Sequence, residues 1–133
     1  PGIPTDERDL VAYVDAQVGD GTLDRVVADG TDHYAHLRTA FEVAFPRLRP
    51  GGRYEIRGWS WAHAADAEEP DRPAATNLLV ELLALVGSGD DVAREVVVDR
   101  DAAVVVRGDR ALPSPFRLAQ TYRNRGIAIR PVL

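Results

Sequence analysis

The sequence contains no cysteine, no methionine and no lysine among its 133 residues. Without cysteine the chain has no disulfide, no thiol nucleophile and no cysteine–zinc site. Long apolar runs are missing too, since the longest, residues 78–86, is interrupted by Glu81 and is too short to span a bilayer. No basic segment followed by an apolar one opens this form of the chain, which predicts no secretory signal. The absence of methionine leaves two readings, a removed initiator or a piece of a longer chain.

The composition that remains is typical of one globular domain with its own core. Hydrophobic residues make up 45% and charged residues 28% of the chain. There are 16 basic and 21 acidic residues, a net charge of -5, which argues against a nucleic-acid partner. We therefore predict a single domain over residues 1–133, cytoplasmic and without membrane or nucleic-acid contacts.

Hydrophobic periodicity predicts an alternating order of helices and strands. Helices are expected at 10–18 after a cap at Thr5 or Asp6, at 34–45, at 78–86 after a cap at Thr76 or Asn77, and briefly near 116–122. Strands are expected at 23–28, 54–59, 95–98 and 103–106, the last two as a hairpin, with a surface loop over 62–75. This order predicts an α/β fold whose first strands are parallel and whose last pair is antiparallel.

Two segments that follow predicted strands carry polar and aromatic side chains. In residues 29–36, Asp29 and His33, and likewise Asp32 and His36, are four apart, so these pairs either bind a divalent metal or cap and solvate a helix start. After the next strand, Arg57, Trp59, Trp61 and His63 either line a pocket for a flat or sugar-like ligand or cover the sheet and core. The glycine pairs in 19–21 and 87–89 fit no phosphate-binding loop, because neither follows a strand in the required pattern.

Residues 23–34 and 41–56 together resemble the second half of class I S-adenosylmethionine-dependent methyltransferases. The closer resemblance is to the metal-dependent sugar O-methyltransferases of macrolide biosynthesis and their cephalosporin-hydroxylase-like relatives. Those proteins carry a strand ending in D-D-G-S-H, a helix ending in F-P-x-L-x-P-G-G and a strand reading Y-V-I-E-D. The resemblance implies half of a Rossmann-like methyltransferase sheet of about four strands, two parallel strands plus a C-terminal antiparallel hairpin, flanked by helices.

The chain departs from that family in two ways. The family's cofactor-binding half would lie before residue 1, so no cofactor is expected for this chain alone, and S-adenosylmethionine only if that half is supplied. The family's metal site is also lost, because Asp29 alone matches a ligand and Arg57 stands where a carboxylate belongs. A guanidinium there repels a divalent cation, so no metal is expected.

Three functional hypotheses follow from the resemblance and its departures. The first is a truncated pseudoenzyme, a non-catalytic half-domain that associates with itself or a partner through the strand at 23–28, which would otherwise be an uncovered edge. The second is the C-terminal part of an S-adenosylmethionine-dependent O-methyltransferase, with His33 or His36 as a base in place of the metal. The third is a small-molecule binding or cyclase-like protein, with a pocket formed by Asp29, Asp32, His33, Arg57, Trp59, Trp61 and His63.

Overall fold

A computed structural model describes residues 4, 6–65, 67 and 74–123 of the chain. The helices and strands in chain order are α1 (Glu7–Val18), β1 (Leu23–Asp29), α2 (Tyr34–Ala44), β2 (Leu48–Arg57), α3 (Ala75–Gly87), β3 (Ala93–Val98) and β4 (Ala102–Arg107). Short 3₁₀ segments cover Phe45–Arg47, Trp59–His63 and Leu118–Gln120. No helix among these residues is long and apolar enough to cross a membrane.

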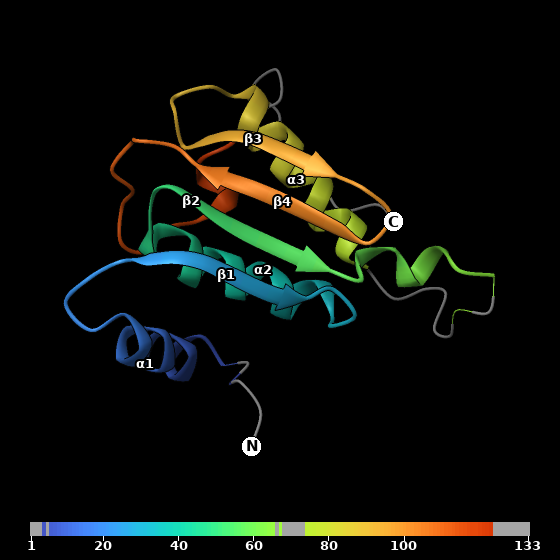
Figure 1. Ribbon diagram of the computed structural model, residues 1–133, viewed down its shortest axis with the longest axis horizontal. Helices are drawn as coiled ribbons and strands as arrows, with labels where there is room; N and C mark the ends of the chain where they lie inside the picture. The colour runs from blue at the N-terminus through green and yellow to red at the C-terminus, as the bar shows by residue number, and fades with distance from the viewer. Residues whose placement is uncertain (1–3, 5, 66, 68–73, 124–133) are drawn as a thin grey trace.

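The four strands form one sheet in the order β1-β2-β4-β3 (Figure 1). β1 and β2 are parallel, and β4 is antiparallel to both β2 and β3. The predicted half-sheet, with two parallel strands and a terminal hairpin, is therefore confirmed. β1 lies at one edge and pairs only with β2, as the resemblance implied.

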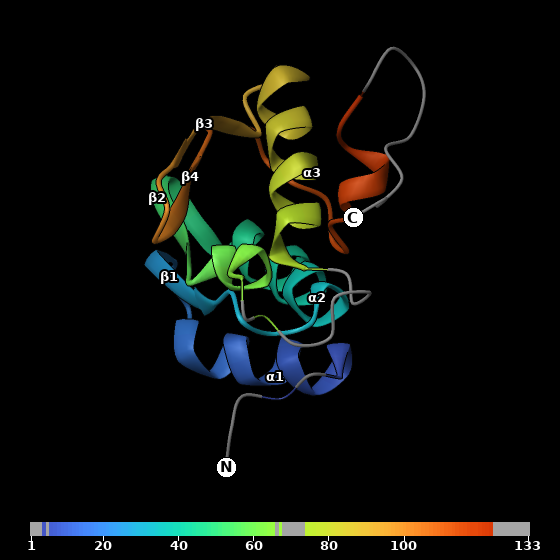
Figure 2. The same cartoon turned by 90° about the vertical axis from the view of Figure 1, so that its right-hand side faces the viewer.

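All three helices lie on the same side of the sheet (Figure 2). The opposite face carries alternate strand residues and is covered by no helix in the part of the chain that the structure describes. Strand register places Arg25, Val27 and Asp29 of β1 on this open face, beside Arg53, Glu55 and Arg57 of β2. The expectation of a sheet flanked by helices thus holds for one face.

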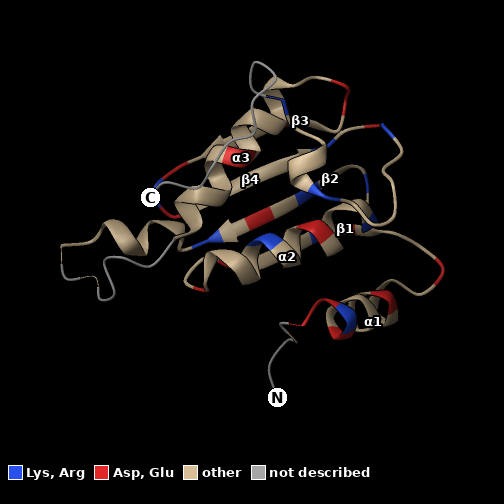
Figure 3. Ribbon diagram, turned by 180° about the vertical axis from the view of Figure 1, so that it is seen from behind, with Lys and Arg blue, Asp and Glu red and all other residues tan. Residues whose placement is uncertain are grey.

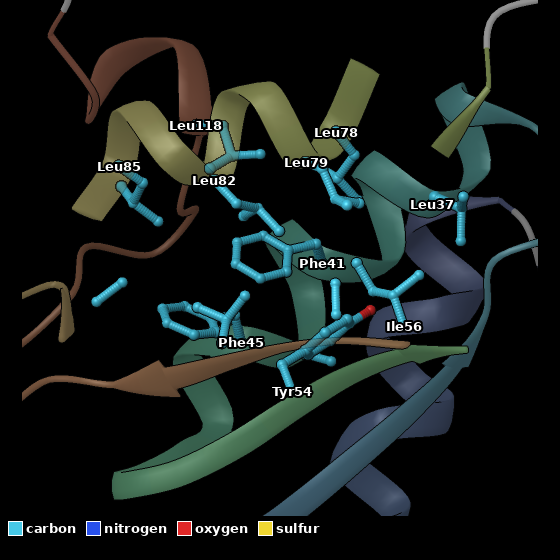
Figure 4. Packing of buried hydrophobic residues seen from close by; sticks show 14 of the residues in the cluster. Leu37, Phe41, Phe45, Tyr54, Ile56, Leu78, Leu79, Leu82, Leu85 and Leu118 are labelled. Atoms are coloured by element: carbon cyan, nitrogen blue, oxygen red, sulfur yellow. The ribbon is translucent and has the colours of Figure 1, made fainter. Parts of the chain in front are cut away.

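The core lies between the sheet and helices α2 and α3 (Figure 4). Phe41 stacks on Phe45 with ring centroids 4.5 Å apart and meets Tyr54 of β2 edge-on at 4.9 Å. Phe116 of the C-terminal segment packs near both phenylalanines. The carboxylate of Glu42 accepts a 2.8 Å hydrogen bond from the Leu118 amide, which fastens this segment to α2.

Several local predictions are confirmed because they rest on short-range chemistry. Asp6 caps α1 and accepts a hydrogen bond from the Asp9 amide, and Gly19, at a φ of 61°, ends that helix. Asp99 accepts hydrogen bonds from the amides of Asp101 and Ala102 and so closes the β3–β4 hairpin.

The prediction for the second strand was wrong at both ends. β2 runs through Pro50, Gly51 and Gly52, which were expected to stand outside it. A register shift against β1 absorbs the extra residues, and Gly52 lies so close to Asp24 that a Cβ would be 3.2 Å from its carbonyl oxygen. At the other end Gly58, at a φ of 71°, terminates the strand, so Trp59 begins a 3₁₀ segment instead.

Two helix predictions also need correction. Helix α3 begins at Ala75, and its N-cap Ala74 supplies no side-chain hydrogen bond, so neither Thr76 nor Asn77 caps it. The short helix expected over 116–122 is a 3₁₀ turn over Leu118–Gln120. Position 116 had been assigned to that helix, but the Phe116 side chain is core and is held by the tertiary packing described above.

Candidate functional site

The candidate site lies where parallel strands β1 and β2 end side by side. Asp29 and Arg57 are register partners at the ends of the two strands. Beyond them, the Gly30 amide donates a 2.6 Å hydrogen bond to the Arg57 carbonyl oxygen. A Cβ on Gly30 would lie 2.6 Å from that oxygen and 2.8 Å from the Trp59 nitrogen, so only glycine allows this approach. The two segments singled out in the sequence are therefore brought together.

The carboxylate of Asp29 is committed to its own turn. One oxygen accepts hydrogen bonds from the Thr31 amide at 3.0 Å and the Thr31 hydroxyl at 2.7 Å. These hydrogen bonds hold the pKa of Asp29 below its usual value, and the bond from the Thr31 hydroxyl has the larger effect. The carboxylate therefore stays ionised. The charge supports the turn that leads into α2.

Basic and acidic positions alternate along β2 on the open face (Figure 3). Glu55 pairs with Arg25 at 2.6 Å and with Arg57 at 3.3 Å. The hydrogen bond from Arg25 is the main reason that the pKa of Glu55 is lowered. Arg57 therefore stands beside Asp29 with an ion-pair partner of its own.

The turn before α2 and the first turn of this helix carry the second acidic group and both histidines of the segment: Asp32 precedes the N-cap residue His33, and His36 lies in the helix. One oxygen of Asp32 accepts from the His33 amide at 2.7 Å and lies 3.2 Å from Nδ1 of His36. The predicted proximity of Asp32 and His36 is thus confirmed, and the His33 and His36 rings meet edge-on at 5.4 Å. In the other pair expected from the sequence, Asp29 and His33, the carboxylate of Asp29 instead accepts its hydrogen bonds from Thr31 within the same turn.

These residues do not fit the divalent metal that the resemblance suggests. Among the described residues no group of three or more histidine and carboxylate side chains is placed to hold a metal ion. One carboxylate oxygen of Asp29 already accepts a hydrogen bond from the Thr31 hydroxyl, and the cross-strand neighbour of Asp29 is the positively charged Arg57. A cation there would meet one shared carboxylate and a fixed positive charge.

The aromatic segment after β2 is tied to the hairpin and to α3. The Trp59 indole donates a 2.8 Å hydrogen bond to the Asp99 carbonyl, and Ser60 donates to the Arg100 carbonyl at 2.9 Å. His63 lies 2.5 Å from the Thr76 hydroxyl and 6.1 Å, ring to ring, from Trp59. These contacts give Trp59 and His63 structural roles, and a ligand pocket of Trp59, Trp61 and His63 remains a prediction.

A cavity of about 320 Å³ opens between α1, β1 and α2. From the sequence-derived candidates its lining includes Asp29, Asp32 and His36, but not Arg57, Trp59, Trp61 or His63. Its remaining walls are largely apolar, and one of them is Tyr54. Sequence reasoning missed Tyr54 as a site residue, since its alternation within β2 indicates only that it points inward.

Comparisons with known proteins identify the scaffold on which this site is built. No protein-family model matches the chain. A tetracenomycin rhamnosyl 2'-O-methyltransferase of Streptomyces olivaceus is 31% identical over 84 residues, and the mycinamicin VI 2''-O-methyltransferase of Micromonospora griseorubida is 38% identical over 61 residues. The chain is similar to part of the macrolide sugar O-methyltransferases. The resemblance predicted from the sequence is thereby confirmed.

Structural comparison places the same methyltransferase-like fold over most of this chain. The MycE methyltransferase of the mycinamycin pathway, solved with Mg, SAH and mycinamycin VI, superposes with a TM-score of 0.59 and 28% identity. The match covers 78% of this chain and 30% of that structure. The matched regions are 22% and 15% of the two curated relatives above, so the chain matches less than a quarter of their length.

Proposed function

We propose that this chain is a non-catalytic methyltransferase-like half-domain that acts by association through the free edge of β1. The observation that carries the proposal is the position of β1, which ends the sheet and pairs on one side only. Such an edge presents unpaired N–H and C=O groups to any strand that can lie beside it. The loss of fit for a metal supports the non-catalytic part of the proposal.

The side chains of β1 favour association over protection. Sheet edges are usually guarded by charged side chains, prolines, bulges or short length, and β1 has charged side chains at Asp24, Arg25 and Asp29. β1 is seven residues long, contains no proline, and exposes Val27 to 45%. An apolar β-branched residue at the middle of a free edge is suited to a cross-strand contact with another strand.

Charge complementarity selects a second copy of the chain as the occupant. In an antiparallel pair centred on Val27, the two Val27 side chains oppose each other, and each Arg25 stands opposite the Asp29 of the other copy. All of these residues lie on the open face, so two opposite-charge pairs flank a central apolar pair. A two-fold axis of this kind is the commonest symmetry of homodimers.

Sedimentation velocity of the wild type and two variants tests the association. We expect a dimer for the wild type, a monomer for Val27→Arg, since two guanidinium groups would meet at the axis, and a dimer for the control Val97→Arg. Val97 is 58% exposed on β3, the opposite edge strand, so it matches Val27 in chemistry and exposure. A wild type that stays a monodisperse monomer at high concentration, or a dimer that Val27→Arg leaves intact, would refute the proposed association.

A second candidate function is the C-terminal part of a working S-adenosylmethionine-dependent O-methyltransferase whose cofactor half is elsewhere. The similarity to MycE favours it, as does the pair of exposed His33 and half-buried His36, either of which would act as the base without a metal. Calorimetry with S-adenosylhomocysteine separates the two functions. If the chain is non-catalytic, S-adenosylhomocysteine should not bind to it, either alone or mixed with the region of the mycinamicin enzyme that lies outside the match. If that mixture recovers both binding and turnover, the second candidate function is supported.

A further inference from the structure

The cavity between α1, β1 and α2 has one polar group on an apolar wall. Its apolar lining comes from three elements, with Leu10 and Val14 on α1, Ala28 on β1, and Leu37 and Ala40 on α2. A volume of about 320 Å³ lies at the lower end of the range found for small-molecule sites. The cavity does not include Trp59, which is bound to the hairpin, but it reaches the edge of β1, where Val27 and Asp29 also line it.

The polar group is the hydroxyl of Tyr54. The residue is only 1% exposed, and its ring packs edge-on against Phe41. Its hydroxyl oxygen points away from Phe45, toward the side of the core where Ile56 and Leu37 lie (Figure 4). No hydrogen bond joins this hydroxyl to any described residue, and burial alone raises the pKa of Tyr54. The hydroxyl oxygen remains accessible from the cavity, so a ligand bound there can form a hydrogen bond with it.

The other polar residues of the lining are Tyr13, His36 and the two carboxylates Asp29 and Asp32, which carry its negative charge. Asp29 and Asp32 each engage one carboxylate oxygen within the β1–α2 turn, at Thr31 and at His33 and His36 respectively. The structure gives the second oxygen of each carboxylate no partner among the described residues. The lining contains no arginine, so its charge favours a cation over an anion.

We propose that this cavity binds a small arylalkylamine, with the ring between α1 and α2, a ring hydroxyl on Tyr54 and the ammonium group at Asp32 and Asp29. The unpartnered Tyr54 hydroxyl fixes one end of the ligand, and the carboxylates select the charge of the other end. This inference needs only residues of one copy, but it shares Asp29 with the proposed association, in which that residue pairs with Arg25 of the other copy.

Tyramine is the probe, and three related compounds isolate each contact. Phenethylamine lacks the hydroxyl, p-cresol lacks the ammonium group, and 3-(4-hydroxyphenyl)propionate replaces it with a carboxylate. Titration followed by ¹⁵N NMR of the amides of β1 and α2 should give tyramine a dissociation constant on the order of 0.1–1 mM, since it has few atoms to contribute. Phenethylamine and p-cresol should bind several-fold more weakly, and the propionate should not bind.

Three variants decide whether the binding is at this cavity. Tyr54→Phe keeps the ring packing and should weaken tyramine about three- to tenfold while leaving phenethylamine unchanged. Asp32→Asn should weaken both amines, and Ala40→Leu should abolish both by filling the cavity. Far-UV circular dichroism and urea unfolding confirm that each variant is folded. Absence of a saturable shift with tyramine, equal binding of the propionate, or equal effects of Tyr54→Phe on both amines would overturn the proposal.

Discussion

A methyl group at position 30 has no room between the ends of β1 and β2. The Cβ of an alanine there would lie 2.6 Å from the Arg57 carbonyl oxygen and 2.8 and 2.9 Å from the Trp59 nitrogen and Cα. All three neighbours are backbone atoms, so no side chain can swing aside. The turn after β1 must instead move away from β2, which breaks the 2.6 Å hydrogen bond from the Gly30 amide to Arg57.

The Gly30→Ala substitution lowers the free energy of unfolding through two destabilising effects, which one stabilising effect partly cancels. Overpacking of a tight site costs about 1–3 kcal/mol, and loss of the hydrogen bond about 0.5–1.5 kcal/mol. Alanine lowers the entropy of the unfolded chain and returns about 0.4–1 kcal/mol. We expect a net loss of about 0.5–4 kcal/mol in the free energy of unfolding, centred near 2 kcal/mol, which is a large part of the stability of a small domain.

Urea unfolding measures this loss, with Gly87→Ala as the matched control. Gly87 lies in the last turn of α3 and has nothing within 4 Å of its Cβ position, so alanine there should be neutral or stabilising by up to about 1 kcal/mol. Tryptophan fluorescence and circular dichroism report the transitions, and Trp59 lies directly at the perturbed turn. If Gly30→Ala proves as stable as Gly87→Ala, the close approach of the two strand ends is refuted, and with it the juxtaposition of Asp29 and Arg57.

Two further predictions concern buried and exposed charge. Glu81 is only 1% exposed; its carboxylate accepts a hydrogen bond from the Tyr34 hydroxyl and lies 3.3 Å from Nε of Arg38. Glu81→Ala should therefore lower the free energy of unfolding in urea by about 2–4 kcal/mol, and Glu81→Gln should lower it clearly less. Equal losses for the two variants would contradict a role for the charge of Glu81. The pKa values of Glu55 and Asp29 are lowered in the folded state, so their contribution to stability is complete above their ordinary values of 4.5 and 3.8 and is lost as the pH falls through the lowered ones. Glu55→Gln should therefore flatten the decline of the unfolding midpoint below about pH 4.5, whereas parallel curves would show that its pairing with Arg25 adds nothing.

Sequence patterns of short range predicted the order of elements and the sheet they form. Residues 34–45 show apolar side chains at helical spacing, and residues 95–106 show two β-branched runs around a polar turn, so each element could be recognised within its own segment. The expectation that no metal binds rests in the same way on the arginine at position 57, which is visible from its identity alone, and it stays a prediction. Errors appeared where local propensity met a distant neighbour. The proline and glycines at 50–52 predict a break, but the pairs that Leu48 and Arg53 form with β1 on either side of them keep β2 continuous.

The sequence by itself determined the scaffold, since hydrophobic periodicity and the spacing of its motifs are properties of the chain read one segment at a time. Only the tertiary structure decided which polar groups are satisfied. The bond from Trp59 to Asp99 joins residues 40 apart, and the unpartnered hydroxyl of Tyr54 depends on walls from α1 and α2. Likewise, each helix sequence shows an apolar face, yet only packing placed all three on one side of the sheet and left the other open.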